Sequence, residues 1–150
     1  MGIKLLPGQI ATVRNKTTRS FAAGADIRFG RPMVYQNQAN STVVLVEATD
    51  LSKPIVAIAG LDQTASGFDR YKQYDAVSAH EDADVGVVIK NGVTVKAGDL
   101  AYLDAGAEFT NVKGTTNLYM GIFKEDMDTT LRTANLSFNL LIPQIKSSIN

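Results

Sequence analysis

The chain has one histidine, His80, which lies two residues after Ser78 and directly before the acidic pair Glu81-Asp82. On a β-strand, residues i and i+2 point to the same face, so Ser78 and His80 would lie side by side. Together with a nearby carboxylate they have the residue types of a hydrolase triad. Triad members normally come from separate loops, however, and neighbours on one strand cannot easily bring the hydroxyl to the ring nitrogen. The pattern therefore favours an ordinary surface histidine, and we expect no catalytic residue and no enzymatic activity.

Two further segments contain residue types that bind ions. The acidic run 81–86 has carboxylates at alternating positions, as calcium loops do, but the residue six positions after Gly86 is Gly92 and not a glutamate. Residues 22–26 are small and include a glycine, but they lack the Gly-Lys-Ser/Thr ending of a phosphate loop. They are better explained as a mobile connection. Because cysteine is also absent, we predict no metal site and no cofactor.

The charge of the chain is zero overall but unevenly distributed. Residues 1–32 hold six basic side chains and one acidic one, whereas residues 33–112 hold five basic and eleven acidic ones. This asymmetry permits electrostatic attraction within the chain or between subunits, with chance unevenness as the alternative. The eleven aromatic residues do not alternate with Arg or Lys as they would in a stacking surface for nucleic acid. We therefore predict no direct contact with nucleic acid.

Short alternating apolar segments with turn residues between them dominate the chain and predict β-strands. The clearest predicted hairpin covers residues 85–95, with Asn91-Gly92 as its type I′ turn. In 134–142, Leu136, Phe138 and Leu140 alternate with polar residues, which predicts a strand with one face in a core. The segments 74–77 (YDAV) and 98–102 (GDLAY) resemble each other, each being an acidic turn followed by a strand. The other predicted strands cover residues 9–14, 27–35, 42–48, 55–59, 76–79, 100–103, 108–112 and 118–124.

About nine short strands without a sustained helical period predict an all-β fold, with single helical turns at most in 61–74 and 128–134. We expect a compact β-barrel or a jelly-roll-like sandwich with an extended N-terminal arm, because closure removes exposed strand edges. Residues 1–20 are predicted to be this arm or a first strand, and residues 21–150 a single β domain. No apolar run has the length of a secretory signal or of a membrane span, so we expect neither.

Several segments follow one another in a distinctive order across residues 25–143. They are IRFGRPMV (27–34), IVAIA (55–59), YDAVS (74–78), NGVTV with KAGDLAY (91–102), and LRTA (131–134) followed by the strand that ends at 136–143. In this order the chain resembles the head cement, or capsid decoration, proteins of tailed bacteriophages. One departure is Tyr74, which stands where the family has a glycine before Asp-Ala-Val.

The resemblance implies a protein that lies on the outside of an icosahedral head and bridges neighbouring capsid subunits without catalysing a reaction. The implied partners are the major capsid protein and further copies of the chain, as a homodimer or homotrimer. The implied location is the outer surface of the virion capsid, after synthesis in the host cytoplasm. From the charge asymmetry we predict the capsid contacts Arg14, Lys16, Arg19, Arg28 and Arg31.

Two alternative functions remain open from the sequence. One is a component of a phage tail or fibre. The other is a carbohydrate-binding β-sandwich, which would usually present exposed aromatic side chains, especially tryptophan, as sugar platforms. Tryptophan is absent from the chain.

Overall fold

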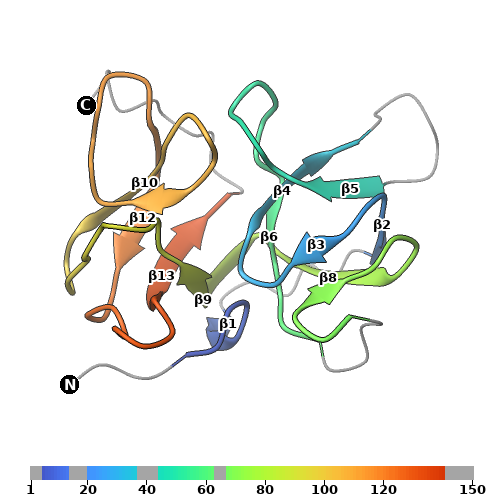
Figure 1. Cartoon of the computed structure of the whole chain (residues 1–150), viewed down its shortest axis with the longest axis horizontal. Helices are drawn as coiled ribbons and strands as arrows, with labels where there is room; N and C mark the ends of the chain where they lie inside the picture. Colours follow the sequence, from blue (N-terminus) through green and yellow to red (C-terminus); the bar gives the residue numbers. More distant parts are fainter. Residues whose placement is uncertain (1–4, 14–19, 37–43, 63–66, 141–150) are drawn as a thin grey trace.

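The computed structural model describes residues 5–13, 20–36, 44–62 and 67–140, and these form strands and turns only (Figure 1). Within those ranges the chain has no helix that could cross a membrane. The predicted all-β fold class is confirmed. The strands are β1 (Ile10–Val13), β2 (Ser20–Ala23), β3 (Ile27–Arg28), β4 (Pro32–Tyr35), β5 (Val44–Glu47), β6 (Ala57–Ala59), β7 (Arg70–Tyr71), β8 (Ala76–His80), β9 (Asp82–Val88), β10 (Leu100–Leu103), β11 (Phe109–Thr110), β12 (Leu118–Phe123) and β13 (Thr133–Asn139).

Five strands close into a small barrel in the order β2-β5-β4-β6-β8. Neighbouring strands are antiparallel except β2 and β5, which are parallel. The pair β3–β7 adds Ile27 and Tyr71 to the apolar interior of the barrel, where both side chains are fully buried. The Tyr71 hydroxyl donates a hydrogen bond of 2.5 Å to the Gly60 carbonyl, so this buried polar group is satisfied.

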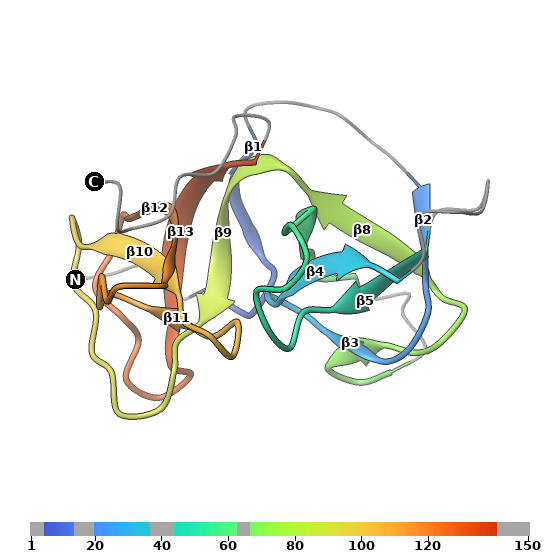
Figure 2. The ribbon, with the colours of Figure 1, turned by 90° about the horizontal axis from the view of Figure 1, so that it is seen from above.

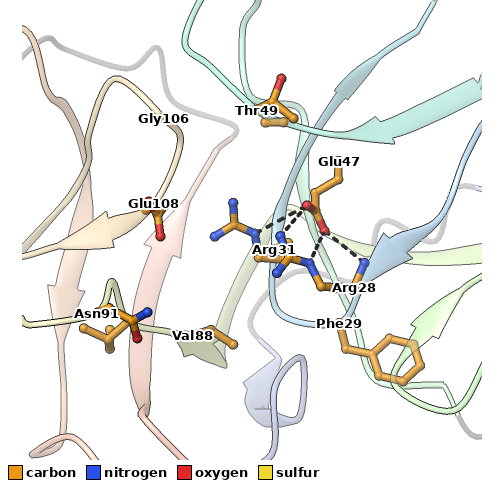
Figure 3. A pocket seen from close by; sticks show the side chains of 11 residues that line it. Arg28, Phe29, Arg31, Glu47, Thr49, Val88, Asn91, Gly106 and Glu108 are labelled. Carbon is orange, nitrogen blue, oxygen red and sulfur yellow. Dashed lines mark hydrogen bonds and ion pairs between the residues drawn. The ribbon is translucent and has the colours of Figure 1, made fainter.

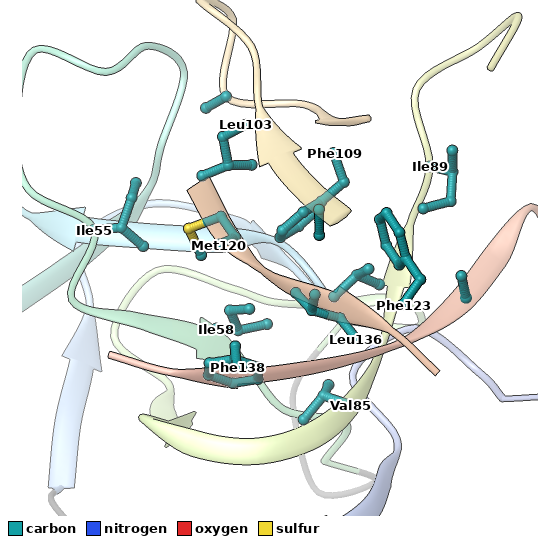
Figure 4. Close-up of a cluster of buried hydrophobic side chains, with 14 of the residues drawn as sticks. Ile55, Ile58, Val85, Ile89, Leu103, Phe109, Met120, Phe123, Leu136 and Phe138 are labelled. Atoms are coloured by element: carbon teal, nitrogen blue, oxygen red, sulfur yellow. The ribbon is translucent and has the colours of Figure 1, made fainter. Parts of the chain in front are cut away.

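Six strands form a second sheet in the order β1-β9-β13-β12-β10-β11, beside the barrel (Figures 1 and 2). Its centre is the antiparallel pair β9–β13, in which Val85 lies opposite Leu136. Their side chains belong to a core that also contains Val34 of β4 and Ile58 of β6 (Figure 4). The larger core is therefore built by the sheet and by the outer wall of the barrel together, which makes the two parts one packed body.

Residues 5–9 form a second connection between the barrel and the sheet. The Gly8 N–H donates to the Gly86 carbonyl of β9 at 2.7 Å, and the Gly8 carbonyl accepts the Leu61 N–H beside the barrel at 2.9 Å. Gly86 is required here, because a Cβ at this position would lie only 2.5 Å from the Leu6 carbonyl oxygen. The Thr133 hydroxyl donates to the Leu5 carbonyl at 2.6 Å and holds the same segment against β13.

The predicted hairpin over 85–95 is wrong. Both edges of β9 are occupied by β1 and β13, so no edge of this strand remains for residues 93–95. The turn after β9 is also of another type: the Val93 N–H donates to the Lys90 carbonyl at 3.2 Å, but only Gly92 has positive φ (82°). This is the pattern of a type II turn, and a type I′ turn would need positive φ at Asn91 as well.

Several smaller predictions also need correction. Residues 22–26 are not simply a mobile connection, since Ala22 and Ala23 belong to β2 and Ala23 is buried. The predicted strand 27–35 is interrupted by a turn with Gly30 at φ 75°, which divides it into β3 and β4. The short strand β7 was not predicted, and the described part of 61–74 contains no helical turn. In 128–134 the Arg132 N–H donates to the Asp128 carbonyl at 2.8 Å, which closes the single turn that the sequence allowed there.

Candidate interaction surfaces

Ser78 and His80 do lie on one strand, as predicted, since both belong to β8 of the barrel. In the part of the chain that the structure describes, no hydrogen bond joins the Ser78 hydroxyl to the His80 ring. The ring instead lies over Gly60, at the place where a side chain on that residue would start. Burial lowers the pKa of His80, so the imidazole is neutral near pH 7.

Within the acidic run 81–86, Glu81 forms a bend and the residues from Asp82 onward belong to β9, so the run does not form a loop. Asp82 and Asp84 share one face of this extended strand, which does not curl around an ion as a calcium-binding loop does. Among residues 5–13, 20–36, 44–62 and 67–140, no group of three or more His, Cys, Asp or Glu side chains could hold a metal.

The five predicted capsid-contact residues have different places in the structure. Arg14, Lys16 and Arg19 lie outside the described residues. Arg28 ends β3, and its side chain is 52% exposed. Arg31 lies between β3 and β4, and its side chain is only 8% exposed. The structure therefore brings Arg28 and Arg31 together but gives them very different access to a partner.

Glu47 of β5 is the ion-pair partner of both arginines. Arg28 holds both carboxylate oxygens, with Nη2 at 2.7 Å from Oε2 and Nε at 3.1 Å from Oε1, and its backbone N–H also donates to Oε1 at 3.1 Å. The hydrogen bond to Glu47 raises the pKa of Arg28. Arg31 reaches Glu47 only at 3.9 Å, and burial lowers its pKa. Glu47 therefore pairs more closely with Arg28 than with Arg31.

A cleft of about 450 Å³ lies between the barrel and the sheet (Figure 3). Arg28, Arg31 and Glu47 line it from the barrel, and Asn91 and Glu108 line it from the sheet. The cleft contains two basic and two acidic side chains, so its net charge is zero. No sequence motif identified this cleft, because its two walls come from segments that are about 60 residues apart in the chain.

The largest exposed apolar side chains of the described surface flank β7. Phe68 is 103% exposed and Tyr74 is 83% exposed. Aromatic side chains are enriched in protein interfaces, and full exposure of a phenylalanine is unfavourable in water. The same exposure is also what a carbohydrate-binding module requires, so each of these two residues is a candidate contact for either kind of partner.

Tyr74 has a backbone conformation, with φ 78°, that residues other than glycine rarely adopt. It is the third residue of a turn closed by a 3.0 Å hydrogen bond from the Asp75 N–H to the Lys72 carbonyl. The third position of a type II turn favours glycine for this reason. The sequence carried a signal of this feature, because Tyr74 stands where the resembled family has glycine, but its exposure was not predicted. Backbone strain persists mostly at functional sites.

Comparison with known proteins adds a family and a fold. A family model described as "Structural cement protein (E217 gp24/Pam3 gp6)" matches residues 3–139 of the chain. Among solved structures, the chain is similar to the head fiber gp8.5 N base in bacteriophage phi29, with 14% sequence identity and a TM-score of 0.55. This similarity covers 83% of the chain and 94% of the other chain, and at such low identity it shows a shared fold only. A comparison with curated proteins gives no match.

Proposed function

The chain belongs to the phage structural cement protein family and is a virion structural protein, and on this premise we propose that it binds the outside of a phage head and reinforces contacts between major capsid subunits. The observation that carries this proposal is the family match, which extends over both the barrel and the sheet. The proposed role is structural and not catalytic.

The proposed mechanism is multivalent attachment. Many weak contacts add up when a protein binds repeatedly to a symmetric shell, and further copies associated as a homodimer or homotrimer would increase this effect. A rigid body supports reinforcement, because a bridge between two subunits resists their separation only if it does not bend. The shared core between the barrel and the sheet, together with the segment 5–9, supplies that rigidity.

Two groups of side chains are proposed to make the capsid contacts. The first is the exposed aromatic pair Phe68 and Tyr74. The second is the basic set predicted from the charge asymmetry, in which Arg28 has the most exposed described side chain. The aromatic pair would supply apolar contact area, and the basic set would supply salt-sensitive attraction to acidic groups.

Co-sedimentation of the purified protein with undecorated heads of its source phage, over a series of salt concentrations, tests this function. We expect saturable binding at a fixed ratio to the major capsid protein. Sedimentation velocity of the free protein would give its oligomeric state. If folded protein failed to pellet with intact heads at every salt concentration, the proposal would be wrong.

A second candidate function is the base of a fibre that projects from the head. The specific observation in its favour is the fold shared with a head-fibre base over 94% of that chain. Electron microscopy of heads saturated with the protein would distinguish the two candidates. A compact knob that bridges capsid subunits supports the cement function, whereas a knob that carries a projecting rod supports the fibre base.

A further inference from the structure

Arg31 is a buried cation that lines the cleft, and its guanidinium has unused hydrogen-bond donors. The residue is 7% exposed, and its Nε is buried without a hydrogen-bond partner. A guanidinium has five N–H donors, and buried donors in folded proteins are almost always paired. Within the described residues, the guanidinium makes no hydrogen bond, and its one ion pair is the 3.9 Å approach of Nε to Glu47. The guanidinium therefore has no hydrogen-bonded counter-ion among the described residues, and its terminal N–H groups are available to an incoming acceptor.

Glu47 does not supply this hydrogen bond, because its Oε2 lies 3.9 Å from Arg31 Nε, beyond hydrogen-bond distance, while Arg28 holds the two carboxylate oxygens at 2.7 and 3.1 Å. The backbone holds Arg31 in place independently of Glu47. Its carbonyl accepts the Ala59 N–H at 2.9 Å, and the preceding Gly30 N–H donates to the Ala59 carbonyl at 2.8 Å. The side chain therefore starts from a fixed backbone position on the wall of the barrel.

The cleft gives an incoming group access to the guanidinium. Figure 3 shows the Arg31 side chain directed away from the barrel, toward the wall that carries Glu108. Of its three nitrogens only Nε is fully buried without a partner, so the two terminal nitrogens reach the space of the cleft. Thr49 and Asn91 add neutral polar side chains to the lining. The volume of about 450 Å³ is large enough for one side chain of a partner.

We propose that this cleft binds a carboxylate from an aspartate or glutamate side chain of the capsid, with Arg31 as its bidentate partner. A planar carboxylate matches the two parallel N–H groups of a guanidinium. A phosphate would bring nearly twice the charge into a cleft that already holds Glu47 and Glu108, which disfavours it. The identity of the partner as a capsid protein rests on the proposed function, but the carboxylate site itself does not.

Nuclear magnetic resonance provides a direct test, since the buried Nε–H of Arg31 is shielded from exchange with water. The wild-type protein is titrated with the peptide acetyl-Gly-Glu-Gly-amide and with its uncharged match acetyl-Gly-Gln-Gly-amide. We expect the Glu peptide to shift the Arg31 Nε–H and the Asn91 amide signals saturably, and the Gln peptide to leave them unchanged. Equal effects of both peptides, or no effect of either, would overturn the proposal. Stronger binding of inorganic phosphate would overturn the choice of carboxylate.

The variants Arg31→Lys and Arg31→Gln separate the fork geometry from charge alone. We expect Arg31→Lys to weaken binding of the Glu peptide about tenfold and Arg31→Gln to abolish it, as read from the Asn91 amide. Urea unfolding verifies that each variant is folded, and the wild-type titration remains decisive if one is not. Full retention of peptide binding in Arg31→Lys would overturn the bidentate role.

Head binding is measured separately, so that the two proposals can fail independently. If wild-type protein pellets with heads and Arg31→Gln pellets at least about tenfold less tightly, the carboxylate belongs to the capsid. If Arg31→Gln pellets as well as wild type, the capsid is not the source of the carboxylate. If wild type binds the Glu peptide but never pellets, the cement function fails while the carboxylate site stands.

Discussion

Tyr74 and Gly98 occupy the same position in two copies of one turn. In each copy the N–H of the following aspartate donates to the lysine carbonyl two residues before Tyr74 or Gly98, at 3.0 Å. Each aspartate also accepts the N–H of that lysine, at 2.8 Å for Asp75 and 2.9 Å for Asp99. The φ angles are 78° at Tyr74 and 92° at Gly98. A bulky aromatic residue thus adopts the conformation for which the other copy uses glycine.

Replacing Tyr74 by glycine should therefore not destabilise the fold. Relief of the left-handed conformation contributes about 1–2 kcal/mol, and the greater freedom of glycine in the unfolded chain offsets about 0.5–1 kcal/mol of it. We expect Tyr74→Gly to raise the free energy of unfolding in urea by about 1 kcal/mol or less. The matched variant Gly98→Ala should lower it by about 1 kcal/mol. A clear loss of stability in Tyr74→Gly would show that the exposed ring has an intramolecular role.

The same substitution should weaken attachment to heads. Phe68 and Tyr74 are the most exposed large apolar side chains of the described surface, and aromatic anchors carry much of the binding energy in interfaces. We expect Phe68→Ala and Tyr74→Gly each to raise the dissociation constant in co-sedimentation about fivefold or more. Ile122→Ala, on the exposed face of the sheet, is the control and should have little effect. Loss of binding in Ile122→Ala alone would place the contact on the sheet instead.

A glycan-binding assay on the same variants tests the carbohydrate alternative. If wild-type protein binds a glycan, fails to pellet with heads, and loses the glycan in Phe68→Ala, these aromatic residues serve a sugar and not the capsid.

Gly86 should tolerate no side chain. A Cβ there would meet the Leu6 carbonyl oxygen at 2.5 Å and the Leu5 Cβ at 2.9 Å, and both belong to the segment that holds the barrel against the sheet. We expect Gly86→Ala to lower the free energy of unfolding by about 1–3 kcal/mol, since overpacking forces the backbone to shift. Gly106→Ala is the control, because its nearest heavy atom lies at 3.6 Å and its stability should change by about 0.5 kcal/mol or less. Equal stability of the two variants would contradict the close contact at Gly86.

Asp104 should make stability depend on pH in the acid range. Its carboxylate accepts hydrogen bonds from Lys90 Nζ at 2.6 Å and from the Gly106 and Glu108 N–H groups at 3.0 Å. Burial by itself raises the pKa of Asp104, but these bonds together outweigh burial and lower it. A lowered pKa in the folded state stabilises the protein above the unfolded value of about 3.9, and this contribution is lost as the pH falls through the folded pKa.

We therefore expect Asp104→Asn to be less stable than wild type by about 1–2 kcal/mol at pH 7, with the difference shrinking below about pH 4. Urea unfolding at several pH values measures this difference. His80 contributes in another range, because its pKa is lowered by burial and its protonation becomes costly below about pH 6.5. That contribution is common to both proteins and cancels in the comparison. A difference that is the same at pH 3 and pH 7 would contradict the role of the Asp104 charge.

Neutralising the predicted basic contacts should reduce both attachment and its dependence on salt. Replacing all five with glutamine removes the attraction that added salt screens. Because Arg28 and Arg31 are already engaged or buried near Glu47, we expect the triple variant of Arg14, Lys16 and Arg19 to produce most of the change in salt dependence. Co-sedimentation between low and high salt measures it. Attachment that is unchanged at every salt concentration would remove the basic set from the proposed contacts.

Local sequence patterns predicted the individual strands well where the chain alternates cleanly. In β13, Leu136 and Phe138 are buried as predicted, and the strand is found within one residue of its expected start. The turn at Gly98 and the strand Leu100–Leu103 were also predicted correctly. The alternation fails at Asn135, which is polar but only 6% exposed, because residues 5–9 cover that face of the sheet. That cover comes from the other end of the chain and leaves no mark in the local pattern.

The class of the fold and the places of most strands could be predicted from the sequence, because both depend on side-chain periodicity and turn chemistry within a few residues. The pairing of β9 with β1 and β13 and the burial of Arg31 in a cleft could not be predicted in this way. Strand partners and burial depend on contacts between segments far apart in the chain. Many pairings share the same local pattern, and packing of the common core selects among them.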